Sequence, residues 1–165
     1  MHDRDTDHWQ QWLDRYGPAL LLFARQWSAT RADAEDAVQD GFVRFWRTRE
    51  AARDLLPYLY TCVRSAAMDL GRGQRRRMRR EQTTDRREAS AFEFPAEQRE
   101  REAAIEVALS QLPGDQREVV VMKIWGGLTF AEIGEALGVS LSTAASRYRY
   151  ALTRLEQELS AEVSP

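Results

Sequence analysis

The sequence is poor in the residues that build metal centres and disulfide frameworks. Its 165 residues include one cysteine, Cys62, and two histidines, His2 and His8. A single cysteine excludes an internal disulfide framework and is typical of a reducing compartment. The histidines have no partner residues at the spacing that a metal site requires. We therefore expect neither a metal nor any other cofactor.

Long hydrophobic runs are also missing. The longest, Ala19–Ala24, is far shorter than the ~20 apolar residues that cross a bilayer, and it begins too far along the chain for a signal peptide. The sequence therefore predicts a cytoplasmic protein without membrane insertion. It also lacks a glycine-rich phosphate loop, a nucleophile elbow and a plausible catalytic set. We expect a binding protein and not an enzyme.

Lysine is nearly absent, since Lys123 is the one lysine among 24 basic residues, and the formal net charge is only −2. The charge is unevenly distributed, however. Between Arg72 and Arg87, eight arginines stand against Glu81 and Asp85, which gives a local net charge of +6. Such asymmetry says more about binding partners than the total charge does, so the near-neutral total does not exclude a nucleic-acid partner.

Apolar residues in the first half recur at three- and four-residue steps, which predicts helices. We expect one helix to begin at Pro18, because proline suits a first helical turn, and a second to cover Asp33–Arg47. A third should begin at Pro57 and lose its apolar pattern at Gly71 and Gly73, and we interpret residues 74–99 as the tail of this helix followed by a linker. The stripes also place tryptophans 27, 46 and 125 in a core, and they predict that Cys62 is a small buried hydrophobe.

The same helical period resumes at residue 100 after a polar, arginine-rich stretch, and no β-alternation persists anywhere. The predicted fold is all-α, with two small helical bundles joined by a flexible linker, the second bundle containing a helix-turn-helix. The predicted boundaries are 1–80 for the first module, 81–99 for the linker and 100–165 for the second module.

The most informative segment covers residues 129–150. Thr129 followed by Glu132 makes a capping box at the start of a helix. Gly138 stands where a helix end requires a left-handed residue, and Ser140 is placed to cap the next helix. A helix, a short glycine-containing turn and a second helix form a helix-turn-helix, whose second helix enters the major groove of DNA.

The second helix of this segment divides into an apolar and a polar face. The apolar residues follow the i, i+4, i+7 spacing of one helix side and should pack inward; they are Ala144, Tyr148, Ala151, Leu152 and Leu155. Hydroxyl and guanidinium groups on the other side suit phosphate oxygens and base edges. The predicted DNA contacts of this helix are Ser142, Thr143, Ser146, Arg147 and Arg149.

Three strings of the sequence resemble bacterial sigma factors. DAEDAVQDGFVRFW (33–46) and LYTCVRSAAMDLGR (59–72) resemble the two halves of the second conserved sigma region. ALSQLPGDQREV (108–119), with the helix-turn-helix after it, resembles the fourth region. These two regions with a short linker between them are the pattern of the extracytoplasmic-function type. The resemblance covers residues 10–75 and 100–160, in the same order and spacing.

The resemblance implies a factor that binds core RNA polymerase and directs promoter-specific initiation, with the −10 element read by the first module and the −35 element by the helix-turn-helix. The helix of residues 33–47 would bind the clamp helices of the polymerase's largest subunit. The side chains assigned to polymerase are Asp36, Gln39, Asp40, Val43 and Arg47.

Residues 58–80 would, by the same resemblance, meet the −10 element and hold a flipped base, which needs a polar pocket with cations around it. The side chains assigned there are Arg64, Ser65, Asp69, Arg72, Arg75 and Arg76.

Three positions depart from the family pattern. Ser65 stands where the family usually has asparagine, and Ala145 and Tyr150 occupy positions that often carry lysine and arginine. Because Ala145 and Tyr150 replace basic residues, we expect either fewer phosphate contacts at the −35 element or a preference for a different −35 sequence.

Two other functions fit parts of the same pattern. A self-sufficient DNA-binding regulator would use the first module for dimerisation or sensing, and a pure interaction protein would bind polymerase or a regulator without touching DNA. The resemblance also permits an anti-sigma factor as a further partner.

Overall fold

The computed structural model describes residues 2–78 and 96–163, in which helices are joined by short turns and loops and no strand occurs. The all-α prediction is therefore confirmed for this part of the chain. Residues 79–95, which include most of the linker predicted at 81–99, lie outside the described residues, and the helix after them begins at Ala96, within the stretch predicted as linker.

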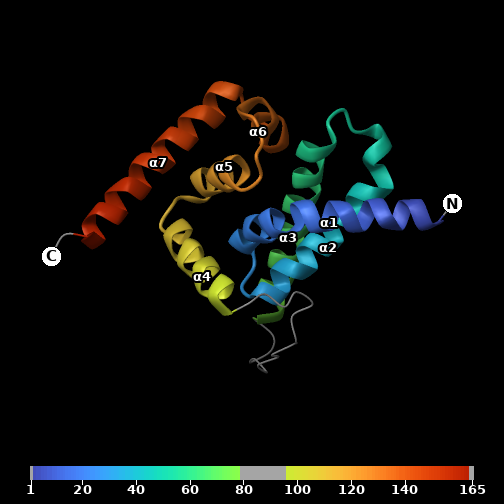
Figure 1. The fold of residues 1–165 in the computed structure, drawn as a ribbon, viewed down its shortest axis with the longest axis horizontal. Coiled ribbons are helices and arrows are strands. Elements are labelled where there is room, and N and C mark those ends of the chain that lie inside the picture. Colours follow the sequence, from blue (N-terminus) through green and yellow to red (C-terminus); the bar gives the residue numbers. More distant parts are fainter. Residues whose placement is uncertain (1, 79–95, 164–165) are drawn as a thin grey trace.

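The first module consists of three long helices, α1 (His2–Ala24), α2 (Arg31–Thr48) and α3 (Leu55–Met78). Short 3-10 turns, Arg25–Trp27 and Arg49–Ala51, follow α1 and α2. The α2 and α3 helices run side by side (Figure 1). Gly41 makes this close approach feasible, because a Cβ there would lie 2.6 Å from the Cα of Val63. Phe23, Phe42 and Leu59 are fully buried between the three helices.

The prediction that a helix begins at Pro18 is wrong, because α1 runs through this residue. Proline inside a helix removes a backbone hydrogen bond and costs ~3 kcal/mol or more. The first half of α1 offsets this cost through aromatic packing on α2. The rings of Trp9 and Phe42 lie 5.4 Å apart, as do those of Trp12 and Phe45, and burying one such side chain contributes roughly 1.5–3 kcal/mol.

The apolar pattern is interrupted at Gly71 and Gly73, but the helix itself continues, and α3 ends at Met78 within the segment interpreted as a helix tail. Gly71 is required for a different reason. A Cβ at this position would lie 2.9 Å from the carbonyl oxygen of Trp27, so the absence of a side chain lets α3 pass close to the turn after α1. The glycine therefore marks a close contact and not a helix end.

The second module contains α4 (Ala96–Ser110), α5 (Gly114–Ile124), α6 (Phe130–Leu137) and α7 (Leu141–Val163). Thr129 and Glu132 form the predicted capping box, and Gly138 has a φ of 69° in the left-handed region. The amide of Thr143 donates to Ser140 Oγ at 3.1 Å, which caps α7. The predicted helix-turn-helix is therefore present as α6 and α7.

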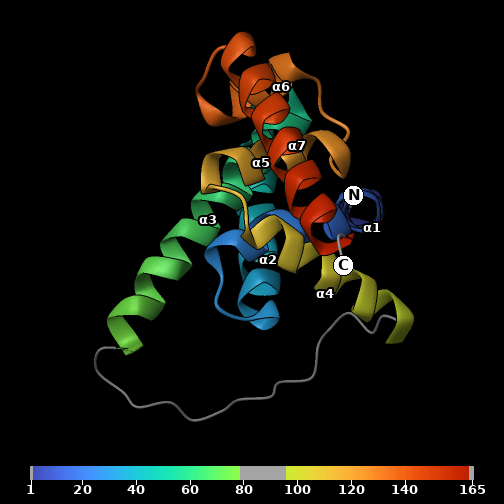
Figure 2. The same cartoon turned by 90° about the vertical axis from the view of Figure 1, so that its left-hand side faces the viewer.

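The two modules are in contact in the structure. The α5 helix lies between α7 and α1, and α6 packs on α3 (Figures 1 and 2). Tyr60 is buried at this junction, where a Cβ on Gly126 would lie 2.6 Å from its hydroxyl oxygen. Burial raises the pKa of this phenol well above its ordinary value.

The predicted core residues have mixed outcomes. Trp27 and Trp46 are partly buried against the core and Cys62 is buried, as predicted. The prediction that Trp125 lies in the core is wrong, because its side chain is 39% exposed at the end of α5. Leu152 of α7, predicted to pack inward, is exposed to the same extent.

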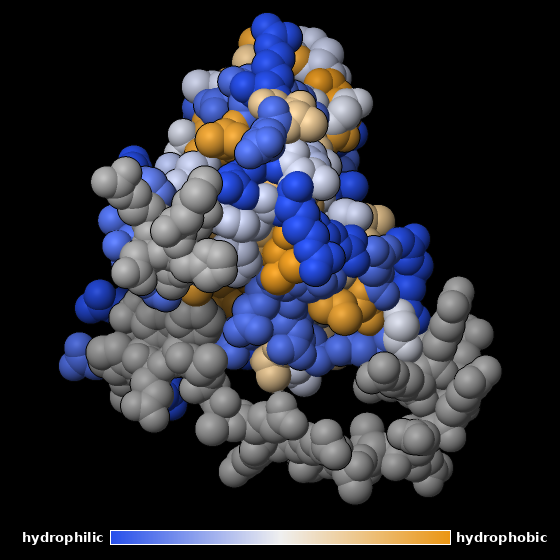
Figure 3. Space-filling view, turned by 90° about the vertical axis from the view of Figure 1, so that its right-hand side faces the viewer, coloured by the Kyte–Doolittle hydropathy of each residue, from blue (hydrophilic) through white to orange (hydrophobic). Residues whose placement is uncertain are grey.

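No helix among the described residues is long and apolar enough to cross a membrane. The surface at the α1 end of the molecule is mostly hydrophilic, with small separate hydrophobic areas (Figure 3).

Candidate nucleic-acid interface

The N-terminal half of α7 is held firmly against α6. Ala144 is fully buried and the ring of Tyr148 lies 5.4 Å from that of Phe130. Gly134 of α6 leaves room for the turn, since a Cβ there would lie 2.6 Å from the carbonyl oxygen of Val139. This packing fixes the direction in which the polar side of α7 faces.

The predicted −35 residues occupy different environments on α7. Ser142 and Arg149 are exposed, whereas Thr143 and Ser146 are half-buried. Ser140 Oγ lies 3.1 Å from Ser142 Oγ and 2.9 Å from Thr143 Oγ1, so a cluster of hydroxyls surrounds the start of the helix. A helix N-terminus with free donors suits a phosphate group.

Arg147 points toward the interior of the molecule, whereas Arg149 is exposed to solvent. Its Nε lies 3.6 Å from Asp115 Oδ2 of α5, and its side chain is only 29% exposed. It lines a cavity of about 390 Å³ between the modules, together with Trp27 and Arg64. In this arrangement Arg147 is directed toward the first module.

Three of the predicted −10 residues lie together on the exposed side of α3. Asp69 Oδ2 accepts from Arg44 Nη1 at 2.8 Å and Asp69 Oδ1 accepts from Arg72 Nη2 at 2.6 Å. Arg44 Nη1 also donates to Ser65 Oγ at 3.3 Å, and Arg44 Nη2 lies 3.0 Å from Asp40 Oδ2. Arg44 therefore links the predicted polymerase surface to the predicted −10 surface.

Sequence reasoning missed Arg44. Its spacing of four residues from Asp40 on one helix was a usable signal, but its contacts with Ser65 and Asp69 depend on the packing of α2 against α3. The hydrogen bond from Arg44, followed by that from Arg72, lowers the pKa of Asp69. The hydrogen bond to Asp69 in turn contributes most to the raised pKa of Arg44.

A groove of about 420 Å³ opens beside this network. Two arginines, four hydroxyl groups and one thiol line it, from Arg44, Arg47, Thr48, Tyr58, Thr61, Cys62 and Ser65. Thr48 Oγ1 and Tyr58 OH lie 2.6 Å apart and so share a hydrogen bond. Burial raises the pKa of the Cys62 thiol, which keeps it neutral. Hydroxyl groups and arginines at one groove match the groups that a nucleobase and its phosphates require.

Arg64 stands apart from the other −10 residues. Its Nε donates to Glu118 Oε1 of α5 at 2.7 Å, and its guanidinium lies 5.6 Å from the ring of Trp27. Glu118 is 5% exposed. Burial raises the pKa of Glu118, and the hydrogen bond from Arg64 opposes that shift. The side chains of Arg75 and Arg76 lie outside the described residues.

The predicted polymerase-binding residues lie on α2. Asp36, Gln39, Val43 and Arg47 are exposed, and Asp40 is half-buried beside Arg44. Val43 gives this surface an exposed apolar side chain among polar ones. A mixed surface of this kind suits a partner protein.

The fold and these surfaces define a class, a two-module helical protein that binds DNA through a helix-turn-helix. Residues 12–77 match the sigma-70 region 2 family, and residues 102–155 match sigma-70 region 4. The RNA polymerase sigma-E factor of Streptomyces coelicolor is 32% identical over 144 residues, which cover 86% of this chain and 80% of the relative. The RNA polymerase sigma factor CarQ of Myxococcus xanthus is 31% identical over 171 residues, which cover 98% and 97%.

A solved structure gives the same fold. The sigma factor RpoE of Bartonella quintana, in complex with the anti-sigma factor NepR, matches with a TM-score of 0.67 and 24% identity, covering 94% of this chain and 98% of that one. The chain belongs to the bacterial RNA polymerase sigma factors, of the extracytoplasmic-function type. Its function is promoter-specific transcription initiation with RNA polymerase.

Proposed function

We propose that the chain reads the −10 element with the exposed side of α3 and the −35 element with the N-terminal half of α7, while α2 binds core polymerase. The observation that carries this proposal is the Arg44 network. One arginine contacts Asp40 on the polymerase side and Ser65 and Asp69 on the −10 side. Residues assigned to two binding partners are thus held in one charged cluster at the contact of α2 and α3.

The groove beside the network is the proposed site of a base flipped out of the opened strand. Arg44 and Arg47 supply cations for the flanking phosphates, and the hydroxyls of Tyr58, Thr61 and Ser65 supply donors and acceptors for a base edge. Ser65 lies 3.3 Å from Arg44 and so has a defined orientation. DNA opening at this site uses binding energy, without covalent chemistry. We accordingly propose a binding protein and not an enzyme.

The −35 assignment rests on the exposed residues of α7. Ser142 and Arg149 face solvent near the start of a capped helix, where a phosphate or a guanine edge is accessible to them. Arg147 is paired with Asp115. Arg149 makes no ion pair among the described residues, and its guanidinium lies 6.0 Å from the ring of the adjacent Tyr150. It therefore reaches −35 DNA without first breaking an ion pair.

Two alanine variants of α7 test this assignment. Arg149→Ala should weaken binding of the polymerase complex to a promoter about tenfold or more, since an arginine contact to DNA contributes ~1–3 kcal/mol. Arg154→Ala removes the same exposed charge further along the helix and should change affinity less than threefold, the control level we set. Gel-shift titration at one fixed salt concentration measures both. Equal affinities for the two variants would overturn the −35 assignment.

We also propose a cytoplasmic protein that an anti-sigma factor regulates. The support is the likeness in fold to the sigma factor solved with the anti-sigma factor NepR. Co-elution of the purified chain with a candidate anti-sigma factor, and loss of promoter-dependent transcription in its presence, tests this partner.

A further inference from the structure

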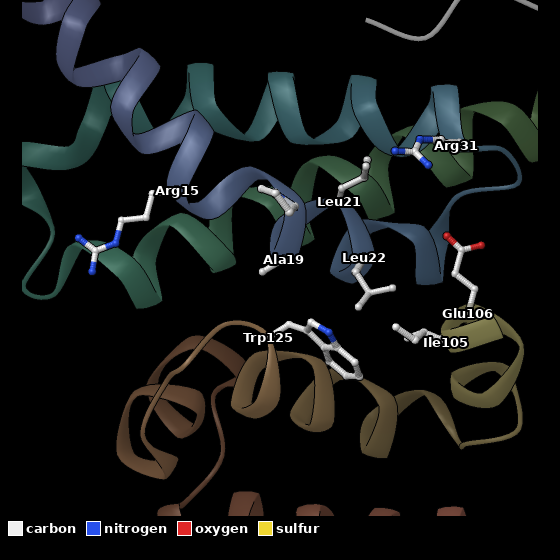
Figure 4. A pocket seen from close by; sticks show the side chains of 9 residues that line it. Arg15, Ala19, Leu21, Leu22, Arg31, Ile105, Glu106 and Trp125 are labelled. Atoms are coloured by element: carbon white, nitrogen blue, oxygen red, sulfur yellow. The ribbon is translucent and has the colours of Figure 1, made fainter. Parts of the chain in front are cut away.

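Trp125 and Tyr150 are the two exposed aromatic residues in the described part of the chain. Trp125 faces Leu22 and Ile105 across a cavity of about 280 Å³ between α1, α4 and the end of α5 (Figure 4). Tyr150 is the more exposed of the two, at 62%, and it lies on α7. One exposed aromatic residue is ordinary on a protein surface, so the place of Tyr150 on the helix decides what it can do.

Tyr150 belongs to the polar side of α7. It lies one helical turn after Ser146, and Arg149 lies two turns after Ser142, so the four side chains share one side of the helix. The buried Ala144 marks the other side, which packs on α6. The guanidinium of Arg149 lies 6.0 Å from the centre of the Tyr150 ring. An aromatic ring and a cation are therefore presented side by side.

Duplex DNA limits what an aromatic ring on such a helix can contact. The bases of a duplex stay stacked, so a side chain in the major groove meets their edges and not their faces. Hydrogen-bonding groups make up most of these edges, and the C5 methyl group of thymine is the apolar group among them. A ring that covers this methyl group removes apolar surface from water. The phenol hydroxyl can at the same time donate to a phosphate oxygen.

We propose that Tyr150 determines specificity in the −35 module, by selecting a thymine through contact of its ring with the C5 methyl group. The neighbouring Arg149 carries a charge and so supports binding to any sequence through the phosphates. Tyr150 carries none, and its contribution depends on the base that it meets. This inference rests on the proposed function, because it takes α7 as the helix that reads the −35 element.

Selection from promoters with a randomised −35 element tests the preference. The full chain is assembled with core polymerase, and the bound promoters are sequenced for the wild type and three variants. The wild type and Tyr150→Phe, which keeps the ring, should enrich thymine at one position, and Tyr150→Ala should lose about fourfold of that enrichment. Leu152→Ala is the matched control, since Leu152 is also exposed but follows Ala144 by eight residues, on the side away from DNA. It should keep the thymine.

The methyl group is then removed from the selected promoter itself. Each thymine of the −35 element is replaced in turn by deoxyuridine, which keeps the hydrogen-bonding edge and lacks the C5 methyl group. One replacement should weaken binding of the wild-type complex about fourfold, the effect of one buried methyl-sized group. The same replacement should leave the affinity of the Tyr150→Ala complex unchanged. Gel-shift titration at one fixed salt concentration measures these affinities.

The outcomes separate this inference from the proposed function. A wild-type complex that tolerates every deoxyuridine replacement, or a Tyr150→Ala complex that selects thymine as strongly as the wild type, would overturn the role of Tyr150. The deoxyuridine series on the wild type requires no variant to fold, and co-elution with core polymerase checks the folding of each variant. A wild-type complex that enriches no base in the −35 element would instead overturn the proposed function of α7.

Discussion

Gly134→Ala tests the proposed −35 reader separately from the −10 reader, because the atoms that a Cβ at Gly134 would meet belong to the turn before α7. Gly134 is buried in α6. Its carbonyl oxygen accepts a hydrogen bond from Val139 N of the following turn at 3.0 Å. A Cβ at this position would lie 2.6 Å from Val139 O and 3.4 Å from the amide nitrogen of Leu141. Both neighbours are backbone atoms, so the start of α7 must move.

The expected cost follows from two opposing effects. Overpacking of this kind costs ~1–3 kcal/mol, and replacing glycine by alanine inside a helix returns up to ~1 kcal/mol. The net loss should be about 1–2 kcal/mol of the free energy of unfolding. Gly73→Ala is the matched control, because a Cβ there meets nothing within 4 Å on α3. It should stabilise the chain by about 0.5–1 kcal/mol.

Urea denaturation measures both free energies, and gel-shift titration of the polymerase complex measures promoter affinity. Gly134→Ala should weaken binding to a promoter with an intact −35 element about tenfold, while binding to core polymerase is unchanged. Gly73→Ala is a control for stability alone, because Gly73 lies in the segment assigned to the −10 element. If Gly134→Ala is as stable as the wild type, the close contact between α6 and the turn does not exist and this reasoning fails.

Three further results are expected. Thr129→Ala removes the cap of α6 and should lower the free energy of unfolding by ~1 kcal/mol; an unchanged urea midpoint would contradict the capping box. Arg44→Ala removes the hydrogen bond that contributes most to the lowered pKa of Asp69, so an NMR titration should show that pKa rise, and a fixed value would refute the assigned cause. Burial raises the pKa of Glu118, so the folded chain binds this proton more tightly than the unfolded chain. The resulting stability is complete below the ordinary carboxyl range and is lost as pH rises through the raised pKa. The free energy of unfolding of the wild type, relative to Glu118→Gln, should therefore fall as pH rises, and an increase would contradict the burial.

The features predicted correctly from sequence are those set by local chemistry. The capping box at Thr129, the left-handed Gly138 and the Ser140 cap depend on residues at most three positions apart. They therefore located α6 and α7 without knowledge of the rest of the chain. The helical period likewise gave the all-α fold, because one helix face must be buried whatever it packs against.

The features missed depend on contacts between distant segments. Pro18 was expected to begin a helix, but the aromatic packing of the first half of α1 on α2 overrides the cost of an internal proline. Gly71 was expected only to interrupt the apolar pattern of a helix, but it accommodates the carbonyl oxygen of Trp27. Arg64 was expected on a DNA surface with Ser65, and its pairing with Glu118, 54 positions away, left no trace in the sequence pattern.

Binding to core polymerase tests the central claim most directly. Purified chain mixed with sigma-free core RNA polymerase should co-elute with it in size-exclusion chromatography. The triple variant Asp36→Ala, Gln39→Ala, Asp40→Ala should not co-elute, whereas a matched triple on α1, Gln10→Ala, Gln11→Ala, Asp14→Ala, should. A folded wild-type chain that elutes apart from the polymerase would contradict the assignment as a sigma factor. Co-elution of the α2 triple variant would leave that assignment standing and contradict the polymerase surface on α2.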